Sequence, residues 1–380
     1  MDFRLTEDQA LIRDSAREFA DEVLAPRAAE LDRTGEFPIE NFKEAAKRGF
    51  AGFIVPESLG GSDVGSLSMA LAMIEINRGC ASTGVTLSVH NSLVSAPLLQ
   101  WGTEDQKKRW LPKLASGEQL GAYSLSEARS GSDAAALQCS AAKDGKHWVL
   151  DGTKMWVTSG SHADLFLVFA RTNRKVSNAK GITAFIVRKG TPGFRVGKSE
   201  EKMGIRASST TELIFEGCRV EEAEVVGQVD GGFKIAMSAL DGGRIGIACQ
   251  ALGIAEACLR ASVKYAKQRV QFGKPIAEYQ PVQWKIAEMG VRIESARLLI
   301  MHAAWLRDRG EPHSYESSSA KLSASRTANF CAREAVQIHG GAGYMTDFPV
   351  ERHFRDARIT EIYEGTTEIQ KIVIARHLLR

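Results

Sequence analysis

The chain has 380 residues, which is too long for one compact core and predicts two or three domains. Its 49 lysines and arginines nearly balance its 46 aspartates and glutamates, so its charge gives no reason to expect nucleic acid or a membrane as a partner. No run of about 20 apolar residues is present to span a bilayer. Six scattered cysteines and eight histidines show no metal-ligand spacing, which indicates buried thiols and predicts no metal site.

The start of the chain bears on where the protein works. It lacks the basic and apolar stretches of a secretory signal, and it is too acidic for an organelle transit peptide. Thr6, with Gln9 three residues later, instead predicts a capping box that opens a helix. We therefore expect a bacterial cytoplasmic protein, with a processed mitochondrial matrix form as the alternative.

Residues 1–121 are predicted to form a helical domain. Leu67, Ala70 and Ile74 recur at the spacing of one helix face, and Thr103 marks another helix start. Residues 122–230 are predicted to form a mostly antiparallel, barrel-like β domain, because no helix-length segment separates their β-rich runs. Those runs lie at residues 148–150, 165–169, 184–187 and 213–215.

Helical periodicity returns in residues 231–380. Met289, Ile293, Ala296 and Ile300 form an apolar seam, and small residues repeat the same spacing from Ala324 onwards. Such seams are typical of helices that pack nearly parallel to one another. We therefore expect a multi-domain α+β protein, with an N-terminal helical domain, a central β domain and a C-terminal four-helix bundle.

Residues 362–368, Ile-Tyr-Glu-Gly-Thr-Thr-Glu, contain a candidate catalytic base. Gly365 permits a tight turn after Glu364, and a helix is predicted to begin directly afterwards. Apolar surroundings raise the pKa of a carboxyl group, as abstraction of a proton from a weakly acidic C–H bond requires. Taken alone, however, Glu364 would be an ordinary loop glutamate before a capped helix.

Two further motifs precede this one. Residues 123–133 read Tyr-Ser-Leu-Ser-Glu-Ala-Arg-Ser-Gly-Ser-Asp, and residues 156–158 read Trp-Val-Thr. With the Tyr-Glu-Gly-Thr run, and in the same order along the chain, they resemble the acyl-CoA dehydrogenase family, most closely its short-chain (butyryl-CoA) branch. This sequence departs from the family at Ala128, where proline is usual, and at Ser159, where many members carry asparagine.

The resemblance implies α,β-dehydrogenation of an acyl thioester to the trans-2-enoyl-CoA. Glu364 would remove the α-proton, while the β-hydrogen leaves as a hydride to N5 of bound FAD. The electrons would then pass to an electron-transferring flavoprotein. In the isovaleryl and long-chain branches the base stands at a position that aligns with Gly243, and glycine cannot act as a base.

The resemblance also implies the remaining site residues. Those expected to bind FAD are Tyr123, Leu125, Ser126, Trp156, Thr158, Arg269, Phe272, Gln280, Gln337, Gly340, Gly341, Thr366 and Glu368. Those expected to bind the acyl-CoA substrate are Ser132, Asp241, Arg244, Tyr363 and Gly365. In the family the segments that hold the ADP half of FAD come from a neighbouring subunit, which implies a homo-oligomer, typically a tetramer.

Several of these residues also have purely structural interpretations. Trp156 would be strand core, Arg269 a surface charge, and Gly340-Gly341 a helix C-cap. Asp241 and Arg244 would form an exposed ion pair, worth about 0.2–0.5 kcal/mol.

The sequence is compatible with more than one acyl group in the substrate and with more than one activity. Gly84 aligns where a glutaryl-CoA enzyme would carry an arginine, which disfavours a dicarboxylic substrate. Butyryl-CoA is therefore the leading expectation, and a short branched acyl-CoA is the alternative. An acyl-CoA oxidase and a catalytically inactive scaffold that binds flavin or CoA are the competing hypotheses.

Overall fold

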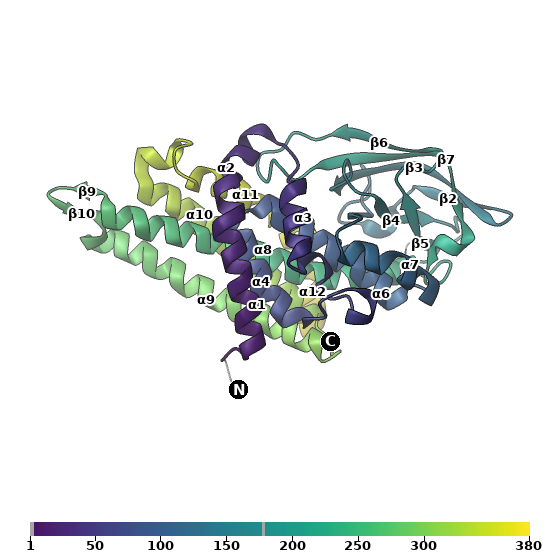
Figure 1. Ribbon diagram of the computed structural model, residues 1–380, viewed down its shortest axis with the longest axis horizontal. Coiled ribbons are helices and arrows are strands. Elements are labelled where there is room, and N and C mark those ends of the chain that lie inside the picture. Colours follow the sequence, from purple (N-terminus) through teal and green to yellow (C-terminus); the bar gives the residue numbers. More distant parts are fainter. Residues whose placement is uncertain (1–3, 177–178) are drawn as a thin grey trace.

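The computed structural model describes residues 4–176 and 179–380, and it forms an elongated molecule with a sheet at one end (Figure 1). Helices occupy the N-terminal part of the chain. Thr6 forms the predicted capping box with Gln9, and Thr103, predicted as a helix start, forms a second one with Gln106. The helices are α1 (Glu7–Phe19), α2 (Ala25–Thr34), α3 (Ile39–Lys47), α4 (Gly65–Gly79), α5 (Ala81–Ser88), α6 (Ala96–Trp101) and α7 (Glu104–Ala115).

Two π-helical segments interrupt this region, η1 (Ala20–Leu24) and η4 (Val89–Ser95). Two 3-10 turns, η2 (Phe50–Gly52) and η3 (Glu57–Leu59), lead into α4. Every residue from Ala81 to Ser95 is buried, including the polar ones. This segment therefore lies in the interior of the protein.

An eight-stranded sheet follows, and it contains all four of the predicted β-rich runs. Its strands run in the order β6-β7-β3-β2-β4-β5-β8, and β1 pairs with β4. Only the β1–β4 and β2–β4 pairs are parallel, so the sheet is mostly antiparallel, as expected. The strands are β1 (Gly121–Ser124), β2 (Ser140–Asp144), β3 (His147–Thr158), β4 (Leu165–Arg171), β5 (Ile182–Arg188), β6 (Phe194–Ser199), β7 (Thr210–Glu221) and β8 (Val225–Val226).

The sheet is folded over on itself. A single residue pair, Ser140 with Arg171, joins β2 to β4, so the sheet bends sharply at this point. Phe194 of β6 meets Phe166 of β4 edge-on and stacks on Phe215 of β7, which fills the space between the two halves. The short turns η5 (Ala134–Ala136) and η6 (Glu222–Glu224) complete this part of the chain.

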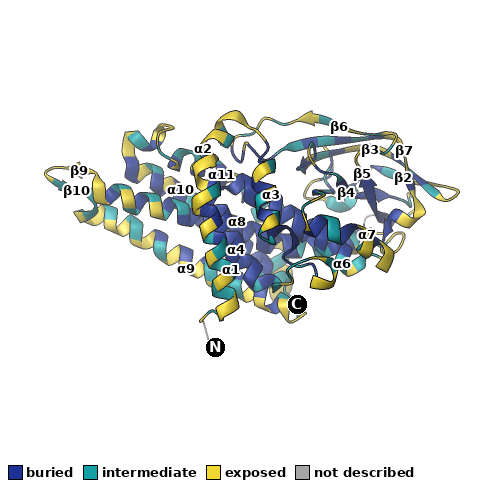
Figure 2. Cartoon of the chain, in the orientation of Figure 1, coloured by how far each residue is buried: buried dark blue, intermediate teal, exposed yellow. Residues whose placement is uncertain are grey.

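The C-terminal part is a helical bundle around the long helix α8, which packs against α4, α9 and α10. By length and composition α8 could cross a membrane, but 78% of its apolar window is buried in the protein (Figure 2). It is therefore the core helix of the bundle. The elements are α8 (Gly232–Gln268), β9 (Val270–Gln271), β10 (Lys274–Pro275), η7 (Ile276–Glu278), α9 (Gln280–Asp308), α10 (Ser314–His339), η8 (Gly340–Tyr344), α11 (Val350–Ile359) and α12 (Thr367–Leu378).

The predicted helix seams are buried. Met289, Ile293, Ala296 and Ile300 face the interior from α9, and the small residues from Ala324 onwards do the same from α10. All six cysteines are buried free thiols, as expected. Within residues 4–176 and 179–380, no group of histidine, cysteine and carboxylate side chains is arranged to hold a metal ion.

Candidate active site

Glu364 lies in the short connection between α11 and α12. It has a φ of 51°, and Gly365 follows with a φ of 95°, so the chain makes two successive left-handed steps. Thr366 then caps α12, with its hydroxyl oxygen accepting a hydrogen bond of 3.4 Å from the Ile369 backbone N–H. The predicted turn and helix start are both present. The left-handed conformation of Glu364 itself is a feature that the sequence did not predict.

The Glu364 carboxylate faces α8 at Gly243. A Cβ atom on Gly243 would overlap Glu364 Oε2, so a side chain at residue 243 and a carboxylate in this position exclude one another. Oε2 is buried and has no hydrogen-bond partner among the described residues. Burial raises the pKa of Glu364 to about 7, although the positive charges of Lys321 and Arg244 act to lower it. A carboxyl group with this pKa is suited to general-base catalysis near neutral pH.

Two tyrosines surround this carboxylate. Burial raises the pKa of both Tyr123 and Tyr363, and the negative charge of Glu364 adds to the effect in each. The Tyr363 hydroxyl donates a hydrogen bond to Gln250 Oε1 of α8. The structure therefore brings one predicted flavin-binding residue and one predicted substrate-binding residue next to Glu364.

Asp241 and Arg244 lie one turn apart on α8, beside the same site. Arg244 Nη1 donates to Asp241 Oδ1 at 2.6 Å, and Asp241 Oδ1 also accepts from Ser314 Oγ at 3.0 Å. Arg244 is 5% exposed, so the interpretation of this pair as an exposed surface ion pair is wrong. Burial lowers the pKa of Arg244, whereas the charges of Asp241 and Glu364 raise it. Arg244 instead places a positive charge close to Glu364.

The loop of residues 123–133 is held by a buried ion pair that the sequence did not reveal. Lys154 Nζ lies 2.8 Å from Glu127 Oε1 and donates to the Leu125 carbonyl at 3.0 Å. Glu127 also accepts hydrogen bonds from the backbone N–H groups of residues 138 and 139. The Ser126 carbonyl accepts from the Met155 N–H at 2.9 Å, so this loop is tied to β3. Ser132, further along the loop, is exposed.

Trp156 lies at an irregularity of β3, between Lys154 and Val157. Its φ is 57° and its side chain is 52% exposed, so the interpretation as strand core is wrong. Thr158 follows on the same strand and is partly exposed. The hydroxyl groups of Ser124 and Ser159 are buried without a hydrogen-bond partner among the described residues. An exposed indole suits stacking on an aromatic ring system such as a flavin, and unpaired hydroxyl groups suit its polar atoms.

A second group of predicted cofactor residues lies at the other end of the molecule. The β9–β10 hairpin, with Phe272 at its turn, projects away from the β domain (Figure 1). Phe272 is 95% exposed, and Arg269 is exposed with no side-chain partner among the described residues. Gln280, Gln337, Gly340 and Gly341 are likewise exposed. Within a single chain these residues do not meet Tyr123, Trp156 or Glu364.

Gly340 does form the C-cap of α10, with a φ of 60°, so its structural interpretation is confirmed. Added Cβ atoms at Gly340 and Gly341 would meet nothing within 4 Å. The backbone there is therefore open to close approach, and Arg269 offers an unpaired guanidinium, which suits a pyrophosphate. Both sets of residues fit the two halves of FAD, which would supply the hydride acceptor when bound.

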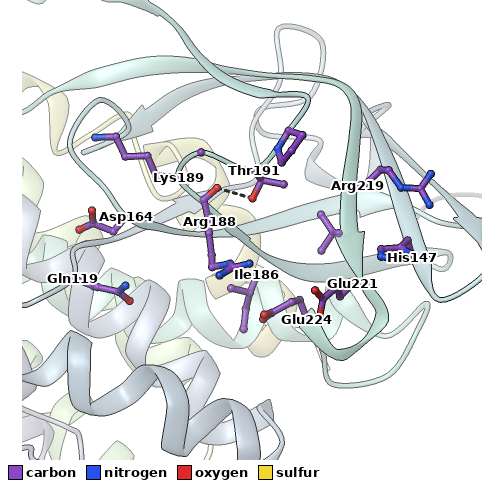
Figure 3. Close-up of a pocket in the computed structure, with 13 residues that line it drawn as sticks. Gln119, His147, Asp164, Ile186, Arg188, Lys189, Thr191, Arg219, Glu221 and Glu224 are labelled. Atoms are coloured by element: carbon purple, nitrogen blue, oxygen red, sulfur yellow. Dashed lines mark hydrogen bonds between the residues drawn. The ribbon is translucent and has the colours of Figure 1, made fainter.

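A surface pocket of about 660 Å³ lies elsewhere, lined by residues of the β domain and by Gln119 (Figure 3). Cations and carboxylates both line it, among them Arg188, Arg219 and Glu221. Thr191 donates a hydrogen bond of 2.8 Å to the Arg188 carbonyl at its rim. None of the predicted site residues lines this pocket.

Known proteins match the chain over almost its whole length. The N-terminal, middle and C-terminal domains of acyl-CoA dehydrogenase match residues 6–118, 122–218 and 230–379. The mitochondrial short-chain specific acyl-CoA dehydrogenase of Rattus norvegicus is 49% identical, over 99% of this chain and 91% of its own.

Two solved structures superpose over the full length of both chains. The butyryl-CoA dehydrogenase of Megasphaera elsdenii is 44% identical, with a TM-score of 0.98. A chain from a structural study of the electron-transferring flavoprotein of Acidaminococcus fermentans is 46% identical, with a TM-score of 0.99. This chain belongs to the acyl-CoA dehydrogenase family, whose members are FAD-dependent oxidoreductases.

Proposed function

We propose that this protein dehydrogenates a short-chain acyl-CoA to the trans-2-enoyl-CoA, with Glu364 as the base that takes the α-proton. The observation that carries the assignment is the Glu364 carboxylate, shielded against Gly243 and with its pKa raised to about 7. A base must be unprotonated to accept a proton, and a pKa near the working pH satisfies this while keeping proton affinity high. FAD, when bound, would supply the acceptor for the β-hydrogen, which leaves as a hydride.

The backbone of Glu364 has a second role in this proposal. Among the described residues, none accepts a hydrogen bond from the Glu364 N–H. This N–H lies just before α12, where the positive end of the helix dipole stabilises negative charge. It is therefore available to the thioester oxygen, on which charge develops as the α-proton leaves. Arg244 adds a buried positive charge that acts on the Glu364 carboxylate.

The interior of the acyl region supports a monocarboxylic substrate. A Cβ atom on Gly84 would overlap the Asn77 side chain, so an arginine cannot be accommodated there without rearrangement. Butyryl-CoA is our first candidate, in line with the named activities of the similar proteins. A short branched acyl-CoA is the second candidate. One methylene group changes the difference in transition-state binding between two substrates by only about 1–3 kcal/mol, which separates similar acyl groups weakly.

We also propose a homo-oligomer, typically a tetramer, in which one copy completes the FAD site of another. Large apolar side chains are exposed along α9, although soluble proteins rarely leave such a surface open. These side chains are Trp284, Val291, Leu298, Leu299 and Trp305. The exposed cofactor residues near Arg269 and Gly340 adjoin the same part of the molecule. The proposed electron acceptor is an electron-transferring flavoprotein, as the relative from the study of that protein suggests.

Replacement of the base tests the proposal. Glu364→Gln keeps the shape of the side chain but removes its basicity, so we expect bound FAD and substrate affinity to persist. The rate at which butyryl-CoA bleaches the flavin should fall by about 10²–10⁴-fold. The matched control is Glu361→Gln, which neutralises a carboxylate three residues earlier that pairs with Arg358. Near-normal bleaching in Glu364→Gln would place the base elsewhere.

The electron acceptor separates this proposal from an acyl-CoA oxidase. The protein is first reduced with butyryl-CoA without oxygen and is then mixed with either an electron-transferring flavoprotein or oxygen. A dehydrogenase is expected to be reoxidised rapidly by the flavoprotein and slowly by oxygen. Rapid reoxidation by oxygen alone would support the oxidase instead.

A further inference from the structure

Lys321 is a fully buried lysine on α10, directly beneath the loop that carries Glu364. A buried ammonium group is costly unless polar partners compensate it. Among the described residues Lys321 has no carboxylate within ion-pair distance, and its hydrogen bond goes to the Gly365 carbonyl at 2.8 Å. Within the described part of the chain, its direct hydrogen-bond partner is therefore the backbone of the proposed catalytic loop.

The same carbonyl has a second buried donor. Gln370 Nε2, from α12, lies 2.8 Å from the Gly365 carbonyl and 3.3 Å from the Glu364 carbonyl. Gln370 is fully buried, like Lys321. Two donors from two helices thus fix the peptide groups of residues 364 and 365 in their left-handed conformation. Since that conformation is unfavourable for Glu364, the donors oppose its relaxation.

We propose that Lys321 is a positioning residue for the base: it holds the Glu364–Gly365 backbone in place and sets a fixed positive charge behind the Glu364 carboxylate. Gln370 shares the first task but, being neutral, not the second. This inference rests on the proposed role of Glu364 as the base. It adds a reason why a shielded carboxylate is still able to ionise.

The charges around Lys321 and Glu364 support these separate roles for Lys321 and Gln370. Lys321 lowers the pKa of Glu364 more than Arg244 does, while burial raises it. Burial lowers the pKa of Lys321 to about 8, and Arg244 acts in the same direction. The carboxylates of Glu364, Glu361 and Glu368 oppose this effect on Lys321. The productive combination, charged lysine with ionised glutamate, therefore belongs to a window between pH values of about 7 and 8.

The pH dependence of flavin bleaching in the holoenzyme distinguishes a charge from a mere packing contact. In Lys321→Met we expect the acidic limb of kcat/KM for butyryl-CoA to move to higher pH by about one unit, because an opposite charge is lost. At pH 7 the ionised fraction of Glu364 then falls from about a half to about a tenth, so the rate there falls about fivefold. In Lys321→Arg, which keeps the charge, the limb should return towards its wild-type position.

Gln370→Leu is the matched control, because it removes a neutral donor from the same carbonyl. We expect it to slow bleaching without moving the acidic limb. If Lys321→Met does not fold, Lys321→Gln takes its place with the same expected shift. An acidic limb at its wild-type pH in the neutral variant, whatever its rate, would overturn the inference.

Glu364→Gln separates this outcome from failure of the proposed function. Loss of bleaching in Glu364→Gln, together with an unmoved limb in Lys321→Met, would overturn only the role of Lys321. Persistent bleaching in Glu364→Gln would remove the base on which the inference rests.

Discussion

The loop that carries Glu364 and the region around the β9–β10 hairpin differ in how many contacts the same chain supplies to their side chains. Around Glu364, helices α8, α10 and α12 supply buried partners for the loop and its neighbours. At the hairpin end, Phe272 is almost fully exposed and Arg269 has no side-chain partner among the described residues. Figure 2 shows the same contrast, with a buried centre and an exposed hairpin. One chain supplies the surroundings of the proposed base, whereas the exposed side chains of the second region have no partner among the described residues.

This contrast has a physical meaning. A buried polar group is kept only where partners compensate its desolvation, so the contacts around Glu364 are part of the fold. Exposed side chains without partners contribute little to the stability of their own chain. Their types, an unpaired arginine and adjacent glycines, suit an anionic ligand brought by another copy. Changes in the two regions should therefore have different consequences.

The largest expected effect concerns stability, at Lys154. Lys154→Met leaves Glu127 buried beneath the 123–133 loop without its cation, which is expected to destabilise the fold by about 3–5 kcal/mol. Chemical unfolding of the holoenzyme at matched protein concentration measures this. The control is Lys143→Met, which removes an exposed lysine from the neighbouring strand β2. An unchanged unfolding midpoint in Lys154→Met would show that the pair does not hold the loop.

At the hairpin end the expected effect is on the cofactor rather than on the fold. Arg269→Ala removes a charged donor from the proposed pyrophosphate site, worth about 1.5–3 kcal/mol, so FAD affinity should fall roughly tenfold to a hundredfold. Titration of the apoprotein with FAD measures the affinity, and circular dichroism should show unchanged helix content. Lys267→Ala, which removes an exposed cation two residues earlier, serves as the control. Equal FAD affinity in both variants would contradict the assignment.

Gly243→Ala tests how closely α8 approaches the base. The added methyl group overlaps Glu364 Oε2 and must displace it, at a cost of about 1–3 kcal/mol. We expect kcat to fall by roughly tenfold while FAD stays bound, because the reacting carboxylate is moved. Gly290→Ala, on α9, is the control, since its Cβ atom would meet nothing within 4 Å. Full activity in Gly243→Ala would mean that Glu364 is not held against α8 during catalysis.

The sequence predicted the features that depend on neighbouring residues. The capping box at Thr6, the helix start at Thr103 and the β-rich runs all depend on residues close together in the chain, so each was predicted without a structure. The turn at Gly365 was found in the same way. The order of helical, β and helical regions followed from these local patterns.

Features made by distant residues escaped prediction. Lys321 is 44 residues from Gly365, and Lys154 is 27 residues from Glu127, so no spacing in the sequence links either pair. The exposed, left-handed Trp156 depends on an irregular pairing of β3 with β7, which alternation of residue types does not reveal. Burial of Arg244 also escaped prediction, because it depends on the place of α8 at the centre of the bundle.

The contrast between the two regions is tested most directly by subunit complementation. Glu364→Gln subunits lack the base but keep Arg269, and Arg269→Glu subunits keep the base but repel the FAD pyrophosphate. If one copy completes the site of another, mixed oligomers contain sites with both groups intact. Co-expression should then restore about a quarter of wild-type activity when pairs of copies form at random. Activity no higher than the sum of the two single variants would contradict a site shared between copies.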